Sequence, residues 1–293
     1  MSGSGGRKTP EVGRGPELGR VSPSGEGGLP VRVSPDAPTR RSSRGLSLFA
    51  LAVVLLPLSC ASAIRFAGLG AEELYSTGVA AFEEEDWDAA IEAFGLLVRE
   101  SPGHPRNPEA RIYTARAHAA REEFITAAAE YETFLQQHPG HGLAPEASLG
   151  ICRAYAELSP IPARDQTYTR EAIQACSETA LQFRGLNVAE EAQAIGDEMW
   201  RKLAEKEYEE GRQYHQRGGL DSAILIYEAV VDTYPDTPWA PRALLAMVRA
   251  YRELGWDAEA EDEAARLLRL YPASDAALEL QRELGDEDPS AGL

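Results

Sequence analysis

The chain has 293 residues and a formal net charge of −18, which is distributed unevenly along its length. Residues 1–59 contain eight lysines and arginines against four acidic residues, so the remainder carries a net charge of about −22. This acidity repels nucleic acid and anionic lipid surfaces, and no basic patch offsets it. The composition therefore argues against nucleic acid as a partner.

The first 44 residues are rich in Gly, Pro, Ser and Arg and contain few large apolar side chains. Such a segment buries too little apolar surface to offset the entropy lost on folding. We predict that residues 1–44 form a disordered extension and that residues 286–293 form a disordered tail.

Residues 45–63 have the order of elements of a bacterial secretory signal. Arginines up to Arg44 precede 13 mostly apolar residues, Leu46–Leu58, and small residues follow as far as Ala63. The apolar run is shorter than the roughly 20 residues of a membrane-spanning helix, so we expect export. A retained membrane anchor is the alternative, because residues 45–64 carry no charge.

Cys60 directly follows the apolar run and resembles the acylated cysteine of bacterial lipoproteins. Pro57 and Leu58 stand where such motifs usually carry Leu and a small residue. We predict that Cys60 carries the lipid, palmitate included, because acyl chains at about 0.8 kcal/mol per buried methylene would anchor a strongly acidic protein. The alternative is cleavage after Ala63, which would release a soluble periplasmic protein.

The other two of the three cysteines are Cys152 and Cys176. They form no CxxC pair, and no histidines have the spacing of a tetrahedral metal site, so we expect no metal and no cofactor. Buried free cysteine behaves as a small hydrophobic residue, so we expect both thiols to be unpaired. A disulfide between them is the alternative in an oxidising compartment.

The acidic part of the chain repeats the residue pattern of tetratricopeptide units, with a small residue, an alanine, an aromatic and a proline at fixed spacing. The matching residues are Gly78, Ala90, Phe94 and Pro102; Ala115, Ala127, Tyr131 and Pro139; Gly211, Ala223, Tyr227 and Pro235; and Ala260, Leu267 and Pro272. Small residues let two helices approach closely, the aromatic ring fills the space between them, and proline ends the second helix.

We therefore predict an all-α tetratricopeptide solenoid of about five repeats over residues 64–285. Ala, Glu, Leu and Arg dominate this range and are strong helix formers. Stacked repeats bury their apolar faces jointly and form a superhelix with a concave groove. We place the repeats near residues 71–105, 106–141, 142–185, 187–237 and 238–273.

The third repeat is irregular. The small residue and the alanine of the pattern are 12 residues apart in the other units, but Gly150 and Ala172 are 22 residues apart here. Pro160 and Pro162 lie in the extra segment. Two prolines forbid a continuous helix. We expect the second helix of this repeat to begin at Thr169, a good N-cap, and to end at Gly185. Residues 188–217 contain neither proline nor a turn cluster, which predicts a long helix.

Three stretches of the chain resemble the BamD family, the lipoprotein subunit of the outer-membrane β-barrel assembly machine of Gram-negative bacteria. They are Arg164–Ala172, which begins with Arg-Asp-Gln-Thr, Leu203–Tyr214 in the fourth repeat, and Tyr234–Pro238 in the turn after it. The resemblance covers about residues 60–275. In one departure, Leu225 and Ile226 stand where family members often have Asn-Arg.

The resemblance implies a scaffold for outer membrane protein assembly. The C-terminal repeats would dock the periplasmic domains of the β-barrel assembly protein, with accessory assembly lipoproteins as further partners. The N-terminal repeats would receive unfolded outer membrane proteins. The lipid anchor would hold the protein at the periplasmic face of the outer membrane.

Similarity to tetratricopeptide grooves implies a client groove in the first two repeats, made of Tyr75, Val79, Phe82, Ile112 and Arg116. The rings of an extended client would pack on Tyr75 and Phe82, and its carboxylate would lie near Arg116. The alternative is that the apolar members of this set belong to the core.

The sequence offers no candidate active site, and we predict that the protein is not an enzyme. The five histidines have no serine, cysteine or carboxylate at the spacing of a triad or a metal site. Glu83–Asp86 lacks the ligand alternation of a calcium loop, so we expect a solvated helix end. Arg164 and Asp165 are expected to form a structural ion pair that braces the extra segment. The alternative function is that of another periplasmic tetratricopeptide adaptor, in envelope division or a peptidoglycan-associated complex.

Overall fold

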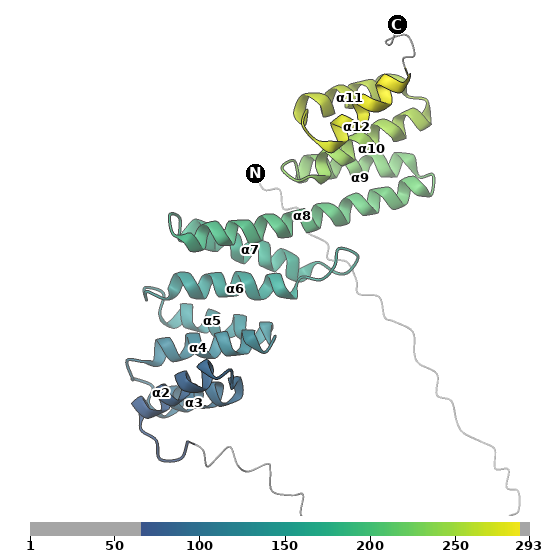
Figure 1. Ribbon diagram of the computed structural model, residues 1–293. Helices are drawn as coiled ribbons and strands as arrows, with labels where there is room; N and C mark the ends of the chain where they lie inside the picture. Colours follow the sequence, from purple (N-terminus) through teal and green to yellow (C-terminus); the bar gives the residue numbers. More distant parts are fainter. Residues whose placement is uncertain (1–65, 288–293) are drawn as a thin grey trace, which may run out of the picture. The chain divides into compact units, whose positions relative to one another are not determined.

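The computed structural model describes residues 66–287, which fold into eleven α-helices without a strand. Figure 1 shows the helices stacked in the order of the sequence, each packed against the next. The pairs are α2 (Ala71–Glu83) with α3 (Trp87–Glu100), α4 (Asn107–Ala120) with α5 (Phe124–Gln137), α6 (Ala144–Leu158) with α7 (Thr167–Gln182), α8 (Asn187–Gln216) with α9 (Leu220–Thr233), and α10 (Trp239–Leu254) with α11 (Asp257–Leu270). The predicted all-α tetratricopeptide fold is confirmed.

The predicted N-terminal extension, the signal segment with Cys60 and most of the C-terminal tail lie outside the described residues. Among residues 66–287, no helix combines the length and the apolar character that crossing a membrane requires.

Close approach of paired helices explains the small residues of the repeat pattern. A Cβ atom added at Gly78 would lie 2.7 Å from the ring of Phe94, and one added at Gly211 would lie 2.7 Å from the ring of Tyr227. Real side-chain atoms do not approach this closely, so each ring occupies the space that glycine leaves. The spacing of small residue and aromatic in the sequence therefore encodes a direct contact.

The third repeat departs from this regular pattern at the start of α7. The helix begins at Thr167 rather than at Thr169. The N-cap is Gln166, whereas Thr169 lies in the first turn, fully buried, and its hydroxyl donates to Gln166 Oε1 at 2.6 Å. The long helix expected after Gly185 is present as the 30-residue α8.

The last helix, α12 (Asp275–Glu287), covers the end of the apolar core. Ala276, Ala277 and Leu280 of α12 are buried in a cluster with Leu244 and Leu267. A terminal repeat otherwise leaves its outer apolar face in water, so α12 has the position of a capping helix. The repeat pattern ends at residue 273 and did not predict it as a separate element.

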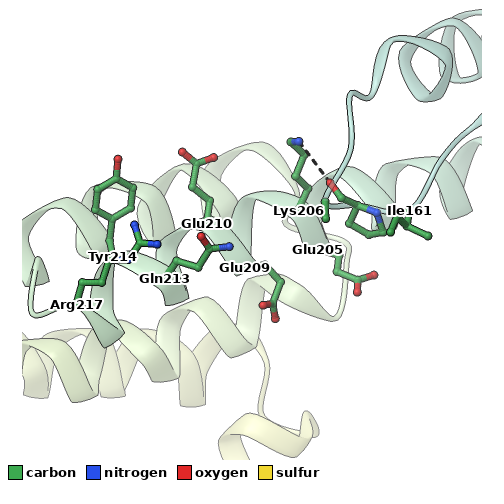
Figure 2. Close-up of a pocket in the computed structure, with 10 residues that line it drawn as sticks. Ile161, Glu205, Lys206, Glu209, Glu210, Gln213, Tyr214 and Arg217 are labelled. Atoms are coloured by element: carbon green, nitrogen blue, oxygen red, sulfur yellow. Dashed lines mark hydrogen bonds between the residues drawn. The ribbon is translucent and has the colours of Figure 1, made fainter.

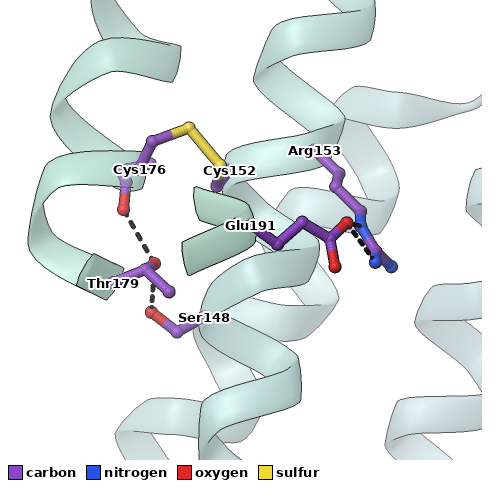
Figure 3. The surroundings of a disulfide bond; sticks show 7 residues. Ser148, Cys152, Arg153, Cys176, Thr179 and Glu191 are labelled. Carbon is purple, nitrogen blue, oxygen red and sulfur yellow. Dashed lines mark hydrogen bonds and ion pairs between the residues drawn. A yellow bond between two sulfur atoms is a disulfide. The ribbon is translucent and has the colours of Figure 1, made fainter. Parts of the chain in front are cut away.

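Cys152 of α6 and Cys176 of α7 form a disulfide within the third repeat, with an S–S distance of 2.12 Å (Figure 3). The expectation of two free thiols is therefore wrong. Their separation of 24 residues carries no disulfide signal, but the helix pair brings the two Cα atoms to 4.8 Å, within the range of natural disulfides. Beside the bridge, the hydroxyls of Ser148 and Thr179 lie 2.7 Å apart and link the same two helices.

Candidate binding surfaces

Four rings of the first two repeats form a cluster that we call the N-terminal aromatic face: Tyr75 and Phe82 of α2, Phe94 of α3 and Tyr113 of α4. The rings of Phe94 and Tyr113 stack with centroids 5.3 Å apart, and Phe82 meets Tyr113 edge-on at 5.1 Å. Tyr75 packs edge-on against Phe94 at 6.0 Å. Phe94 is fully buried, whereas the other three rings and Val79 are partly exposed. The face can therefore contact a partner without unfolding the repeat.

Ile112 does not belong to this face, so its assignment to the client groove is wrong. It is 1% exposed and packs with Tyr131 and Phe134 in the core of the second repeat. Successive residues of a helix point about 100° apart, and the next residue, Tyr113, is the one that meets the rings of α2. The sequence analysis missed Tyr113. The two α2 rings, seven residues apart on one side of a helix, were the signal for an aromatic partner on the facing helix.

Two arginines lie over the N-terminal aromatic face. The guanidinium carbon of Arg106 is 5.0 Å from the ring centroid of Tyr75, and that of Arg116 is 5.3 Å from Tyr113. Arg116 Nε also donates to Glu146 Oε1 of α6 at 2.7 Å. Arg106, the residue before α4, pairs with Glu109 of that helix at 3.3 Å. Both cations of this face therefore already have carboxylate partners.

A second cluster, the C-terminal aromatic face, consists of Tyr208 of α8, Tyr227 of α9, and Trp239 and Arg242 of α10. The ring of Tyr208 lies 5.6 Å from Tyr227 and 5.2 Å from Trp239, centroid to centroid. The guanidinium carbon of Arg242 is 4.8 Å from the centroid of Trp239. Burial raises the pKa of Tyr208 and of Tyr227, so both hydroxyls stay protonated at physiological pH.

A cavity of about 440 Å³ adjoins the C-terminal aromatic face; its lining includes Tyr208, Trp239, Arg242, Leu245, Asp275 and Glu279. Arg249 at its side donates to Glu283 at 3.2 Å and also pairs with Glu279. Arg242 has no ion-pair partner within 4 Å among residues 66–287. Its guanidinium is therefore supported by a ring on one side and available to a ligand on the other.

The insertion, defined as residues 159–166 between α6 and α7, is organised around the buried side chain of Gln166. Gln166 Nε2 donates to the carbonyl oxygen of Ile161 at 2.9 Å and to that of Arg164 at 3.0 Å. Its Oε1 accepts from Thr169. The glutamine of the Arg-Asp-Gln-Thr segment thus holds the backbone of the insertion from inside.

Two lysines of α8 hold the insertion from outside. Lys202 Nζ donates to Ser159 Oγ at 2.9 Å, and Lys206 Nζ donates to the carbonyl oxygen of Arg164 at 2.9 Å. A cavity of about 580 Å³ lies between the insertion and α8 (Figure 2). Its lining includes Ile161, Pro162, Glu205, Glu210, Tyr214 and Arg217.

The expected ion pair between Arg164 and Asp165 does not form among the described residues. Asp165 Oδ1 instead accepts from the backbone N–H of Thr167 at 2.9 Å, and hydrogen bonding to Thr167 lowers the pKa of this carboxyl group. Gln166 and the two lysines brace the insertion in place of that ion pair.

Catalytic or metal-binding groupings were sought across residues 66–287 as well. No group of three or more His, Cys, Asp and Glu side chains in this range could hold a metal ion. In the Glu83–Asp86 turn, the carboxylate of Asp86 accepts from the backbone N–H of Ala89 at 3.1 Å and caps α3. This contact gives the acidic turn a structural role.

The family of outer membrane lipoproteins described as YfiO matches residues 69–277 of the chain. The chain belongs to this family. It is similar to the outer membrane protein assembly factor BamD of Caulobacter vibrioides, with 27% identity over 215 residues, 73% of this chain and 70% of that protein. It is also similar to BamD of Rickettsia prowazekii, with 26% identity over 201 residues, 69% of this chain and 80% of that protein. The BamD resemblance read from the sequence is confirmed.

Similar solved structures are tetratricopeptide proteins. A TPR repeats protein from Bacteroides fragilis has a TM-score of 0.43 and 14% identity, covering 75% of this chain and 99% of that one. The TPR2AB-domain:pHSP90 complex of yeast Sti1 has a TM-score of 0.41 and 15% identity, covering 74% and 84%. The family match itself spans both aromatic faces and the insertion.

Proposed function

We infer that this protein is an outer membrane protein assembly factor. In this role it is a scaffold that docks a β-barrel assembly protein and receives unfolded outer membrane proteins for folding and insertion. The observation that carries the proposal is the family match over residues 69–277, together with two relatives named as BamD. The role requires binding surfaces and no catalysis, and two aromatic faces at opposite ends of the repeat array supply such surfaces.

The N-terminal aromatic face is the proposed client site. Its exposed rings, Tyr75, Phe82 and Tyr113, together with Val79, would pack against the aromatic side chains of an extended client. A client carboxylate would reach Arg116 by replacing Glu146, which now accepts its hydrogen bond at 2.7 Å. This exchange would favour clients that bind through their rings first and through the carboxylate second.

The C-terminal aromatic face is the proposed docking site for the periplasmic domains of the assembly protein. Arg242, stacked on Trp239, offers a planar guanidinium to a carboxylate of the partner. Leu225 on the neighbouring α9 is 73% exposed. An apolar contact at Leu225 would replace the polar one that family members with Asn-Arg at this place can make.

The proposed location is the periplasmic face of the outer membrane, with Cys60 as the lipid anchor. The order of basic, apolar and small residues around Cys60 supports export, and the buried Cys152–Cys176 disulfide supports an oxidising compartment. Mass spectrometry of the mature N-terminus tests the anchor. An unmodified start at Ile64 would remove the lipid from the proposal.

Co-purification from membranes in mild detergent tests the scaffold role. We expect the β-barrel assembly protein to co-purify with the intact chain and the accessory lipoproteins to follow. Recovery of division or peptidoglycan-associated proteins in its place would favour a different periplasmic adaptor.

Client crosslinking tests the N-terminal face separately. Phe82→Ala and Arg116→Ala are expected to reduce crosslinking of an outer membrane protein peptide. The matched control Ile125→Ala removes an exposed apolar side chain, 58% exposed, from the start of α5. Unchanged crosslinking in folded Phe82→Ala protein would remove the groove from the proposal.

A further inference from the structure

A tryptophan of α8 is exposed at the point where the neighbouring helix α9 ends. Trp200 is 39% exposed, although a ring of this size stabilises a fold most when it is buried. α9 has 14 residues against 30 in α8, so it stops beside the middle of the longer helix (Figure 1). The ring centroid of Trp200 lies 5.4 Å from that of Tyr234, the residue that follows α9. A single exposed ring is common on protein surfaces, so the groups around it determine whether it can bind a ligand.

The turn that faces this tryptophan is held in place from several sides. The backbone N–H and the hydroxyl of Thr237 both donate to the carbonyl oxygen of Tyr234, at 3.1 Å and 2.9 Å. The hydroxyl of Tyr234 donates to the carboxylate of Glu207 on α8. The hydroxyl of Tyr271 from the next repeat donates to the carbonyl oxygen of Pro235 at 2.9 Å. A wall that is already ordered loses little conformational entropy when a ligand binds to it.

A cavity of about 490 Å³ lies between this turn and α8, and both rings line it. Its polar lining residues are Gln193, Asp197, Arg201, Thr233, Asp236 and Thr237. Gln193, Asp197 and Arg201 follow one another at intervals of four residues, so they lie along one side of α8. Within residues 66–287 the side chains of these three make no hydrogen bond or ion pair, and neither does that of Asp236. Hydrogen-bond donors and acceptors are therefore available together beside an exposed ring.

The mixture of charges in this lining argues against an ion as the ligand. An anion would meet Asp197 and Asp236, and a cation would meet Arg201. Nucleic acid is disfavoured as well, because the chain carries a net charge of −18. A wholly apolar ligand would leave these polar groups without hydrogen-bond partners. The lining instead fits a ring with an apolar face and hydroxyl groups at its edge, since each hydroxyl both donates and accepts. A pyranose sugar has this form.

We propose that this cavity binds a neutral glycan, with the apolar face of one sugar ring packed on Trp200. Asp197 and Asp236 accept hydrogen bonds from the sugar hydroxyls, and Gln193 and Arg201 donate to them. Gln193 and Arg201 are eight residues apart, about 12 Å along the helix, so a short oligosaccharide fits the site better than a single sugar. The site shares no residue with either aromatic face. Only the source of the glycan rests on the proposed periplasmic location.

Isothermal titration calorimetry with chitotetraose, an uncharged chain of N-acetylhexosamine rings, tests the proposal. The purified full chain is kept in a detergent without a sugar headgroup, so that the detergent does not compete. Trp200→Ala is expected to weaken binding about tenfold or more, because the stacking surface is lost. Trp200→Phe is expected to return the dissociation constant to within about threefold of the parent value. Asp197→Ala with Asp236→Ala is expected to weaken binding about tenfold, because two charged acceptors are lost.

Two matched controls separate the site from general effects of ring and charge removal. Trp256→Ala removes a ring that is 47% exposed and lies at the other end of α10. Glu190→Ala with Glu198→Ala removes two exposed carboxylates from the same half of α8. Both controls are expected to leave the dissociation constant within about twofold and the far-ultraviolet circular dichroism unchanged.

Sedimentation assays distinguish the two sources of glycan that the proposed location offers. Purified peptidoglycan sacculi should carry the chain into the pellet if the glycan strand of peptidoglycan is the ligand. Vesicles that contain lipopolysaccharide should do so if its saccharide is the ligand. In either case Trp200→Ala should reduce the pelleted fraction and Trp256→Ala should not, which would assign the binding to this cavity.

Equal affinity of the parent and of folded Trp200→Ala protein for chitotetraose would overturn the proposal, and so would equal weakening by Trp256→Ala. Binding of a lysine-rich peptide without any binding of chitotetraose would show a protein-docking surface and would overturn it as well. None of these results bears on the proposed assembly function, because co-purification with the β-barrel assembly protein measures that function separately.

Discussion

The two aromatic faces have similar components but differ in the state of their arginines. On the N-terminal face, Arg116 lies over Tyr113 and donates to Glu146. On the C-terminal face, Arg242 lies over Trp239 with no ion-pair partner among the described residues. An arginine that is already paired mainly supports its ring, whereas an unpaired guanidinium can bind a carboxylate of a partner. We therefore expect ring contacts to dominate binding at the first face and charge to contribute more at the second.

The same two ends also differ in the turns that join their paired helices. In the first two repeats the left-handed residue of the turn is glutamate, Glu85 with φ 59° and Glu122 with φ 60°. In the fourth and fifth repeats it is glycine, Gly218 with φ 78° and Gly255 with φ 75°. A side chain in this conformation costs about 1 kcal/mol relative to glycine. The N-terminal repeats therefore carry local strain that the C-terminal repeats avoid.

The largest effects are expected from removing the central ring of each face. Phe94→Ala should lower the free energy of unfolding of the N-terminal repeats by about 3–5 kcal/mol, because a fully buried ring is replaced by a cavity. Tyr227→Ala should do the same to the C-terminal repeats. Hydrogen exchange followed by mass spectrometry measures the protection of the two regions separately, since each repeat contacts only its neighbours. Equal loss of protection at both ends in either variant would show that the faces are not independent.

The next largest effect on the free energy of unfolding is expected from removing the disulfide of the third repeat, which lies between the two faces along the chain. The double variant Cys152→Ala with Cys176→Ala should lose about 3 kcal/mol, the value expected for a cross-link that closes a loop of 24 residues. Urea unfolding should then become broader, because the two ends would unfold at different concentrations. Addition of a reductant is the control, and it should shift the parent protein toward the variant while leaving the variant unchanged.

The sequence predicted the helices and the repeats well because their pattern records contacts within single helix pairs. Gly78 and Phe94 touch, and their spacing alone reveals the pair. Contacts that depend on how one pair meets the next were harder to predict. Ile112 was chosen where Tyr113 faces α2, since helix rotation is set by packing between repeats. The disulfide lies within one helix pair, and it was missed because the regular repeat spacing does not apply to the irregular third repeat.

The insertion shows a further limit of prediction from sequence. Arg164 and Asp165 were chosen as its brace because they are oppositely charged neighbours. The side chain that holds the loop is the neutral Gln166, which is 1% exposed and donates to two carbonyl oxygens. A single uncharged residue in a loop has no sequence pattern that indicates whether it is buried. Only the path of the backbone around it reveals its role.

An effect of intermediate size is expected on the affinity for the assembly protein, and it should distinguish the arginines of the two faces. Arg242→Ala is expected to weaken binding of the assembly protein by roughly tenfold, since one charge-assisted hydrogen bond to a carboxylate is lost. Arg116→Ala should leave that affinity unchanged, because this arginine lies at the other end of the array. Titration at two salt concentrations measures both, and the loss for Arg242→Ala should shrink at high salt. An equal loss for both variants would contradict the assignment of separate partners.

The smallest effect is expected from the turns, where the two ends differ in the left-handed residue. Glu85→Gly is expected to raise the free energy of unfolding by about 0.5 kcal/mol, because relief of the left-handed strain slightly exceeds the added flexibility of the unfolded chain. Glu84→Gly is the matched control: Glu84 is also exposed, but its φ is −83°, so glycine there should destabilise by a similar amount. Gly255→Ala should be destabilising by about 1 kcal/mol at the other end. Thermal unfolding of the three variants measures these shifts, and a loss of stability in Glu85→Gly would show that its backbone conformation is not strained.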